Sequence, residues 1–124
     1  MKVNKYICQA PAVFTGDAFY IVGGKESKYG GSIGTNSNTI GRLDAFMKVW
    51  SQAGSLINAR SEHSAIYYAS SLMVVGGFSG QFSTEKCTIN ETQVTCVEQD
   101  PKLIDYYGYP ALFLVPSDFC QSSL

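Results

Sequence analysis

The chain has 124 residues, of which 45% are hydrophobic and 15% are charged, and its formal net charge is −1. This length suits one domain, and the combination of many apolar residues with few charged ones excludes an intrinsically disordered chain. The near-neutral charge gives no electrostatic basis for binding nucleic acid or an anionic membrane, and no apolar run approaches the ~18 residues of a membrane span.

Residues 1–10 are predicted to form an N-terminal extension. Lys2 and Lys5 are not followed by an apolar stretch of ~7–15 residues, so the segment does not resemble a secretory signal. This favours a cytoplasmic chain, whereas the cysteines and a glycosylation sequon described below hint at an extracellular parent. The localisation therefore stays open.

An internal repeat organises the rest of the chain. Two apolar runs that each end in a glycine pair lie 53 residues apart: Phe19–Val22 with Gly23 and Gly24, and Leu72–Val75 with Gly76 and Gly77. A second offset of 46 residues relates the segment that begins at Arg60 to the one that begins at Tyr106. The same unit thus begins three times, near residues 11, 64 and 110. Self-similarity of this kind is the signature of a repeat architecture.

Each unit is predicted to contain four short strands. The first unit, residues 11–63, has strands at Ala12–Thr15, Ala18–Val22, Thr39–Leu43 and Met47–Gln52. The second unit, residues 64–109, has strands at Ser64–Tyr68, Leu72–Val75, Glu85–Ile89 and Gln93–Glu98, and residues 110–124 are the start of a third unit and a tail. The second strand of each unit is apolar at successive positions, which is typical of a strand buried on both faces. The glycine pairs are expected to supply positive φ angles and close backbone approach.

The glycine pair of the first unit is followed by an acidic turn position at Asp44, by Trp50 six residues later and by Arg60 before the next strand. With this order of residues the first unit resembles the kelch repeat. The resemblance implies an all-β fold: a partial kelch-type β-propeller with about two four-stranded antiparallel blades plus one extra strand. It also implies that Trp50 is buried between blades.

The second unit is degraded relative to the first. It keeps Gly76 and Gly77 but has Asn90, Cys96 and Tyr106 at the positions of the Asp, Trp and Arg. Kelch repeats are about 50 residues long and propellers close with 4–8 blades, so two blades leave open edges and faces. Three explanations stay open: a piece of a larger propeller, self-association that covers the open blades, or a small disulfide-braced β-domain.

Four cysteines, at positions 8, 87, 96 and 120, allow three connectivities. If the turn between the third and fourth strands of the second unit centres on Glu91 and Thr92, Cys87 and Cys96 face each other across the strands and can form a disulfide. Two buried thiols are the alternative. No C-x-x-C motif supports a zinc site, and Asn90-Glu91-Thr92 is an N-glycosylation sequon.

Catalytic chemistry finds little support in the sequence. His63 is the single histidine, and its neighbour Glu62 is expected to point to the opposite face of a strand. The chain has no nucleophile elbow and no phosphate loop, and it predicts no cofactor and no metal. The kelch resemblance also admits a remnant of a copper oxidase, but one histidine cannot supply the Tyr, Cys and His ligands of that family.

The resemblance favours a non-catalytic protein-interaction module. It implies that the loops after strands two and four share one face, to which a protein or peptide partner binds. The candidate partner-binding residues on these loops are Tyr29, Arg60, Phe78, Tyr106 and Tyr107. Arg60 has an alternative role as a hydrogen-bonding strut between blades. A purely structural extracellular repeat is the competing function.

Overall fold

The fold is known from a computed structural model that describes residues 6–29, 34–79, 83–100 and 110–115. Within these ranges the chain forms β-strands and no helix, which confirms the predicted all-β class. In this described part of the chain, no helix has the length and apolar character needed to cross a bilayer.

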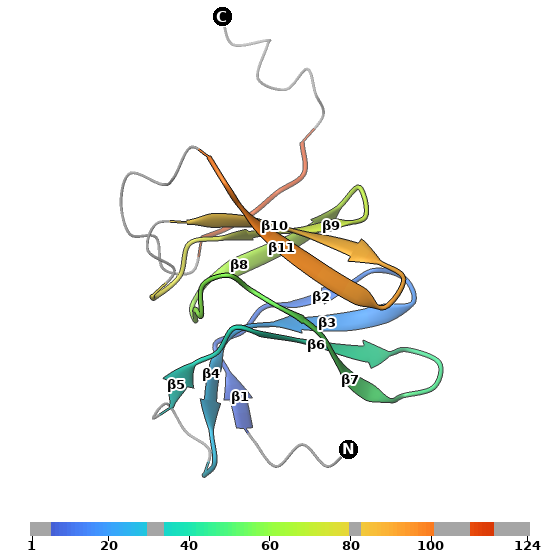
Figure 1. The fold of residues 1–124 in the computed structure, drawn as a ribbon, viewed down its shortest axis with the longest axis horizontal. Coiled ribbons are helices and arrows are strands. Elements are labelled where there is room, and N and C mark those ends of the chain that lie inside the picture. The colour runs from blue at the N-terminus through green and yellow to red at the C-terminus, as the bar shows by residue number, and fades with distance from the viewer. Residues whose placement is uncertain (1–5, 30–33, 80–82, 101–109, 116–124) are drawn as a thin grey trace, which may run out of the picture.

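Two four-stranded antiparallel meanders follow each other along the chain (Figure 1). The first consists of β2 (Ala12–Phe14), β3 (Ala18–Val22), β6 (Thr39–Asp44) and β7 (Trp50–Ser55). The second consists of β8 (Ser64–Tyr68), β9 (Ser71–Val75), β10 (Thr84–Asn90) and β11 (Gln93–Gln99). All eight predicted strands are therefore present, within a few residues of their expected bounds.

The fourth strand of the first meander begins later than predicted. It starts at Trp50 rather than Met47, because the carboxylate of Asp44 holds the preceding turn together. Its Oδ1 accepts hydrogen bonds from the backbone amides of Phe46 and Met47, at 3.0 and 2.8 Å. These bonds lower the pKa of Asp44. Asp44 thus has the turn-forming role expected of an Asp side chain at this position.

The two meanders join into one eight-stranded sheet that is nearly closed like a barrel. Their fourth strands, β7 and β11, pair in parallel at Gly54 with Val94 and at Ser55 with Thr95. The two edge strands of this sheet, β2 and β8, contact each other. One hydrophobic core, with members from both meanders, fills the space between them: Val13, Ala18, Tyr20, Val22, Ile40, Ala53, Leu56, Leu72, Val74, Cys87, Val94 and Cys96.

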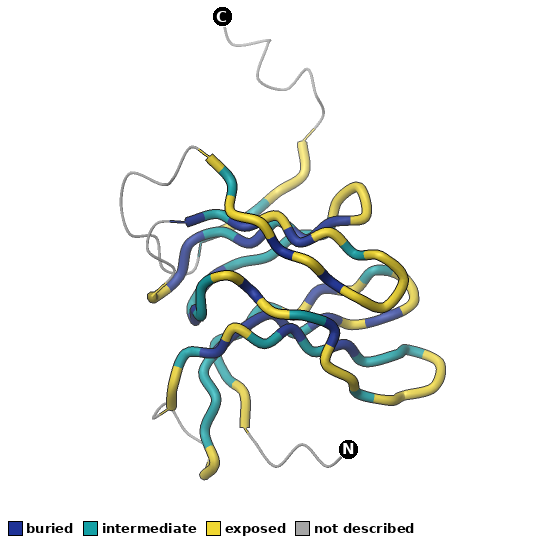
Figure 2. The backbone as a smooth tube through the Cα atoms, in the orientation of Figure 1, coloured by how far each residue is buried: buried dark blue, intermediate teal, exposed yellow. Residues whose placement is uncertain are grey.

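Burial alternates along β3, contrary to the expectation of a strand buried on both faces (Figure 2). Ala18, Tyr20 and Val22 point into the core, whereas Phe19 is 42% exposed and Ile21 is half-buried. The reason is that, within the described residues, the second meander covers only one side of the first. The apolar residues on the outward side of β3 remain open.

A small three-stranded sheet was not expected from the sequence. β1 (Tyr6–Cys8) pairs with β4 (Lys25–Ser27), which pairs with β5 (Thr35–Asn36), so residues predicted as an extension and a loop form strands. Gly24 permits this arrangement, because a Cβ atom there would lie 2.6 Å from the Cβ of Ala10 and 2.8 Å from the carbonyl oxygen of Cys8.

The extra strand predicted at the start of a third unit is absent from residues 110–115, which form no strand. This segment nevertheless lies beside the second meander, because the hydroxyl of Ser64 at the start of β8 donates a hydrogen bond to the carbonyl of Pro110. Without pairing along a strand edge, the segment has no ladder of backbone hydrogen bonds to hold it as a strand.

The predicted disulfide between Cys87 and Cys96 is confirmed. Along β10 and β11 the residues pair in the expected register, which places these two cysteines directly opposite each other in the core. Cys8 ends β1 and is half-buried, and Cys120 lies outside the described residues.

Removing this disulfide with the double substitution Cys87→Ala/Cys96→Ala is expected to lower the free energy of unfolding by about 2–3 kcal/mol. The bond closes a short loop, with a sequence separation of 9, and so restricts the unfolded chain only moderately. Urea denaturation measures the change. An unchanged unfolding midpoint relative to the oxidised parent would show that the bond contributes nothing to stability.

Candidate functional site: a loop face above a buried arginine

The connections that follow β3, β7 and β9 meet at one end of the two meanders, on the left in Figure 1. The side-chain amide of Asn36 donates to the hydroxyl of Ser79 at 2.9 Å. Ser61 and Phe78 exchange both backbone hydrogen bonds, at 3.2 and 2.6 Å. Three of the four loops predicted to share a face therefore do so. We call the described residues of 25–38, 56–63 and 76–83 the loop face.

Two predicted partner-binding aromatics lie exposed on this loop face. Tyr29 is 94% exposed and Phe78 is 53% exposed. Ile57, which the sequence analysis did not single out, adds a side chain that is 56% exposed. Tyr106 and Tyr107 lie outside the described residues. The loop face thus offers separate apolar side chains among small polar ones.

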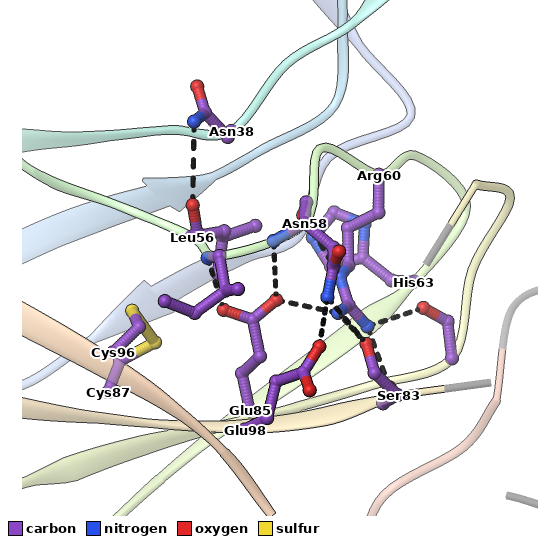
Figure 3. A network of polar contacts seen from close by, with 12 residues as sticks. Asn38, Leu56, Asn58, Arg60, His63, Ser83, Glu85, Cys87, Cys96 and Glu98 are labelled. Carbon is purple, nitrogen blue, oxygen red and sulfur yellow. Dashed lines mark hydrogen bonds and ion pairs between the residues drawn. A yellow bond between two sulfur atoms is a disulfide. The ribbon is translucent and has the colours of Figure 1, made fainter. Parts of the chain in front are cut away.

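Arg60 is not available to a partner, which corrects its prediction as a partner-binding residue. Its side chain is fully buried below the loop face (Figure 3). One terminal nitrogen, Nη1, donates to the carbonyls of Gly76 and Ser83, both at 2.9 Å. The other, Nη2, donates to the Ser83 hydroxyl at 2.5 Å and pairs with the carboxylate of Glu85 at 2.6 Å. Arg60 is therefore a strut that joins the first unit's last loop to the second meander.

Glu85 completes this buried network, and sequence reasoning missed it. Its carboxylate accepts backbone hydrogen bonds from Ile57 at 2.6 Å and from Asn58 at 3.2 Å, in addition to the bond from Arg60. Burial lowers the pKa of Arg60, while the charge of Glu85 acts in the opposite direction. An ion pair with its remaining acceptors satisfied in this way is the form in which charges are tolerated in a core. The network therefore fixes the 56–60 backbone against β10.

The four glycines of the two pairs adopt the expected positive φ angles. The angles are 62° at Gly23, 97° at Gly24, 72° at Gly76 and 92° at Gly77. The close backbone approach is also confirmed. A Cβ atom on Gly77 would lie 2.5 Å from the carbonyl oxygen of Ser61, and one on Gly23 would lie 2.9 Å from that of Arg60. The 60–63 segment can therefore pass between the ends of β3 and β9.

His63 lies buried where this segment passes between the two glycine pairs. Its Nε2 is 2.7 Å from the carbonyl oxygen of Val22 and must carry the proton, because a carbonyl only accepts. Burial lowers the pKa of His63 to about 4, and the nearby charge of Arg60 adds to the effect. The side chain thus joins the two meanders as a neutral imidazole, which does not suit it as a general acid or base near neutral pH.

His63 is expected to make the protein less stable as the pH falls. Its pKa is lower in the folded chain, at about 4, than its ordinary value of 6.5, so the unfolded chain takes up the proton first. The contribution of neutral His63 to the free energy of unfolding is complete above about pH 6.5. It falls by about 2 kcal/mol between pH 6.5 and about pH 5.

Urea denaturation of wild type and of His63→Gln at several pH values tests this. The variant should be less stable at pH 7 but should lose the slope between about pH 6.5 and pH 5, because the chain has no other histidine. Equal slopes in the two proteins would contradict the assignment.

Trp50 lies on the outward side of the first meander and not between the meanders, which corrects the expectation of burial. It is half-buried and packs over Gly41, whose ideal Cβ position would lie 3.6 Å from the Trp50 ring. Cys96, which has the position of Trp50 in the second unit, is buried in the core.

Three potential metal ligands come together within the described ranges. The ligand atoms of Glu85, Cys87 and Cys96 lie within 4.8 Å of one another. The two sulfurs, however, are joined in a disulfide and are not thiolates, and the carboxylate is paired with Arg60. The group therefore fits a structural role better than a metal site.

Comparison with known proteins gives no family assignment. No protein-family model matches the chain, and no curated protein matches it.

Proposed function

We propose that this chain is a non-catalytic protein-interaction module built from kelch-type repeats, belonging to a larger propeller, and that a protein or peptide partner binds the loop face. The observation that carries the proposal is the meeting of three loops from two consecutive meanders at one end of the sheets. Hydrogen bonds between Asn36 and Ser79 and between Ser61 and Phe78 hold these loops together.

The kelch part of the proposal is supported by the roles of its motif residues. The glycine pairs turn the chain with positive φ angles, Asp44 closes the turn before the fourth strand, and Arg60 ties one meander to the next. Pro110, at the start of the expected third unit, is held against β8. Each of these contacts is what a repeated four-stranded unit needs in order to stack on its neighbour.

The chemistry of the loop face favours a protein or peptide as its ligand. Tyr29, Ile57 and Phe78 are exposed apolar anchors, and serine and asparagine residues surround them. Aromatic side chains that are framed by small, adaptable polar residues are typical of recognition surfaces. The strut below them restricts the backbone, which lowers the entropy lost on binding.

Affinity capture with quantitative mass spectrometry tests this function. We expect a protein captured by the wild-type chain to be lost with Tyr29→Ala/Phe78→Ala but retained with Met47→Ala. Met47 is 75% exposed in the turn at the opposite end of the sheets and is a matched control for removing an apolar side chain. Equal capture by all three chains would refute the loop face as the binding site.

A second candidate, a disulfide-braced extracellular repeat, is favoured by the Cys87–Cys96 bond and by the exposed position of Asn90 in its sequon. Expression through a secretory pathway tests it. A mass that falls on treatment with a peptide N-glycosidase, and does not fall for Asn90→Gln, supports this candidate, whereas an unglycosylated chain argues against it.

A further inference from the structure

The outward side of the first meander has an uninterrupted line of apolar side chains. The cross-strand register places them side by side, in the order Phe14, Phe19, Leu43 and Trp50. We call them the aromatic row. Phe14 is 52% exposed, Phe19 is 42% exposed, and their ring centroids are 4.6 Å apart. Contiguous exposed apolar side chains of this kind mark a contact surface.

The second meander shows what covers this position. Its residues at the same places in the four strands are Tyr67, Leu72, Cys87 and Cys96. Leu72 and Cys87 are fully buried, Cys96 is 7% exposed, and Tyr67 packs against the same core. The row that lies open in the first meander is therefore a buried contact surface in the second.

The reverse holds for the other face. In the first meander the row that contains Val13, Tyr20 and Arg42 points toward the second meander and is buried. The matching row of the second meander points outward and consists of Ile66, Met73, Lys86 and Val97. We call it the aliphatic row. Val97 is 56% exposed, and Met73 is half-buried.

The contact inside the chain thus joins two unlike faces, and it leaves one face of each kind open. We propose that a second copy of this chain docks its aliphatic row on the aromatic row of the first, and so repeats the internal contact between molecules. Contacts between unlike faces are heterologous and continue from copy to copy until a ring closes. Since propellers close with about 4–8 units, two to four copies complete such a ring.

The proposed contact has the same two kinds of face as the contact between the two meanders inside the chain. The partner that fits both open faces is therefore a second copy of this chain. The proposal rests on the repeat architecture of the proposed function and takes the other blades of the larger propeller to be further copies of this chain, but it does not depend on the loop face as a partner site. Charge does not oppose it, because Lys86 is the one charged member of the two rows and would meet no cation in the aromatic row.

Sedimentation of the full chain and of two variants tests the arrangement. Wild type is expected to form species of two to four copies as its concentration rises. Phe19→Asp blocks the aromatic row and Met73→Asp blocks the aliphatic row, so each variant alone should stay monomeric. An equal mixture of the two should form a one-to-one dimer that grows no further, because only one pair of intact unlike faces remains.

Other outcomes would overturn the proposal. They are a wild-type chain that stays monomeric at every concentration, a mixture that stays monomeric, and a Met73→Asp chain that still dimerises, since the last result would mean symmetric contact between like faces. Thr92→Asp, in the exposed turn between β10 and β11, controls for the added charge and should assemble like wild type.

If an aspartate variant does not fold, as judged by circular dichroism, a serine variant of the same row takes its place. Phe14→Ser then replaces Phe19→Asp, and Ile66→Ser replaces Met73→Asp. Tyr29→Ala/Phe78→Ala should assemble normally. A failed assembly and a failed loop-face interaction are therefore told apart.

Discussion

Replacing Arg60 by methionine is expected to lower the free energy of unfolding by about 3–5 kcal/mol, because it leaves a buried carboxylate without its partner. The Arg60–Glu85 pair is fully buried on both sides and spans 2.6 Å. The substitution also removes the hydrogen bonds to the carbonyls of Gly76 and Ser83. Urea denaturation at low protein concentration measures the loss.

The double variant Arg60→Met/Glu85→Met is the matched control. Two apolar side chains of similar length leave no buried charge, so the double variant should be more stable than either single variant. If the single variants do not fold, recovery of the folded state in the double variant still demonstrates the coupling. Additive losses, or a loss below about 1 kcal/mol for Arg60→Met, would contradict the role of the strut.

Replacing Gly77 by alanine is expected to lower the free energy of unfolding by about 3–5 kcal/mol, from positive-φ strain and from steric overlap. Its φ is 92°, and a Cβ atom there would lie 2.5 Å from the carbonyl oxygen of Ser61 and 2.6 Å from the Cβ of His63. Neither neighbour is the flexible end of a side chain, so the backbone of the 60–63 segment must move.

Gly16→Ala separates the two causes. Gly16 has a similar φ of 100° but has no atom within 4 Å of its ideal Cβ position, so only the conformational strain of about 1–2 kcal/mol applies. Thermal or urea denaturation of both variants gives the comparison. Equal losses at the two positions would show that close approach of the 60–63 segment adds nothing at Gly77.

Much of the sheet could be predicted because local pattern and long-range pairing agree. The apolar runs before the glycine pairs indicate β3 and β9, and the turn at Glu91 fixes the register that places Cys87 opposite Cys96. A hairpin register follows from its turn alone, so it needs no knowledge of the rest of the fold.

Other features depend on tertiary contacts that no local pattern reveals. β1, β4 and β5 have two or three residues each and form because they find one another. The burial of Glu85 depends on an arginine 25 residues earlier in the chain. A glutamate on a predicted strand gives no signal that it is buried, since most are exposed.

The candidate site was predicted in outline but not in its details. Three of the four loops that were expected to meet do so, yet Arg60 lies beneath the surface and Trp50 lies on the outside of the sheet. The 46-residue offset of the sequence repeat, which matches Asp44 with Asn90, also matches Leu43 with Ile89, whereas the strand registers place Leu43 at the position of Cys87. Leu43 and its partner Trp50 are 7 residues apart in the chain, whereas Cys87 and its partner Cys96 are 9 apart. This difference shifts the correspondence, and only the pairing of strands reveals it.

The two meanders share one hydrophobic core, so we expect them to unfold as a single cooperative unit. Trp50, the one tryptophan, reports on the first meander, and Leu72 is a fully buried residue of the second. In urea denaturation followed by Trp50 fluorescence, Leu72→Ala is expected to lower the unfolding midpoint by an amount equivalent to about 2–5 kcal/mol. If the fluorescence transition stays at the wild-type urea concentration while circular dichroism shows an additional, earlier transition, the two meanders unfold separately and do not form one cooperative unit.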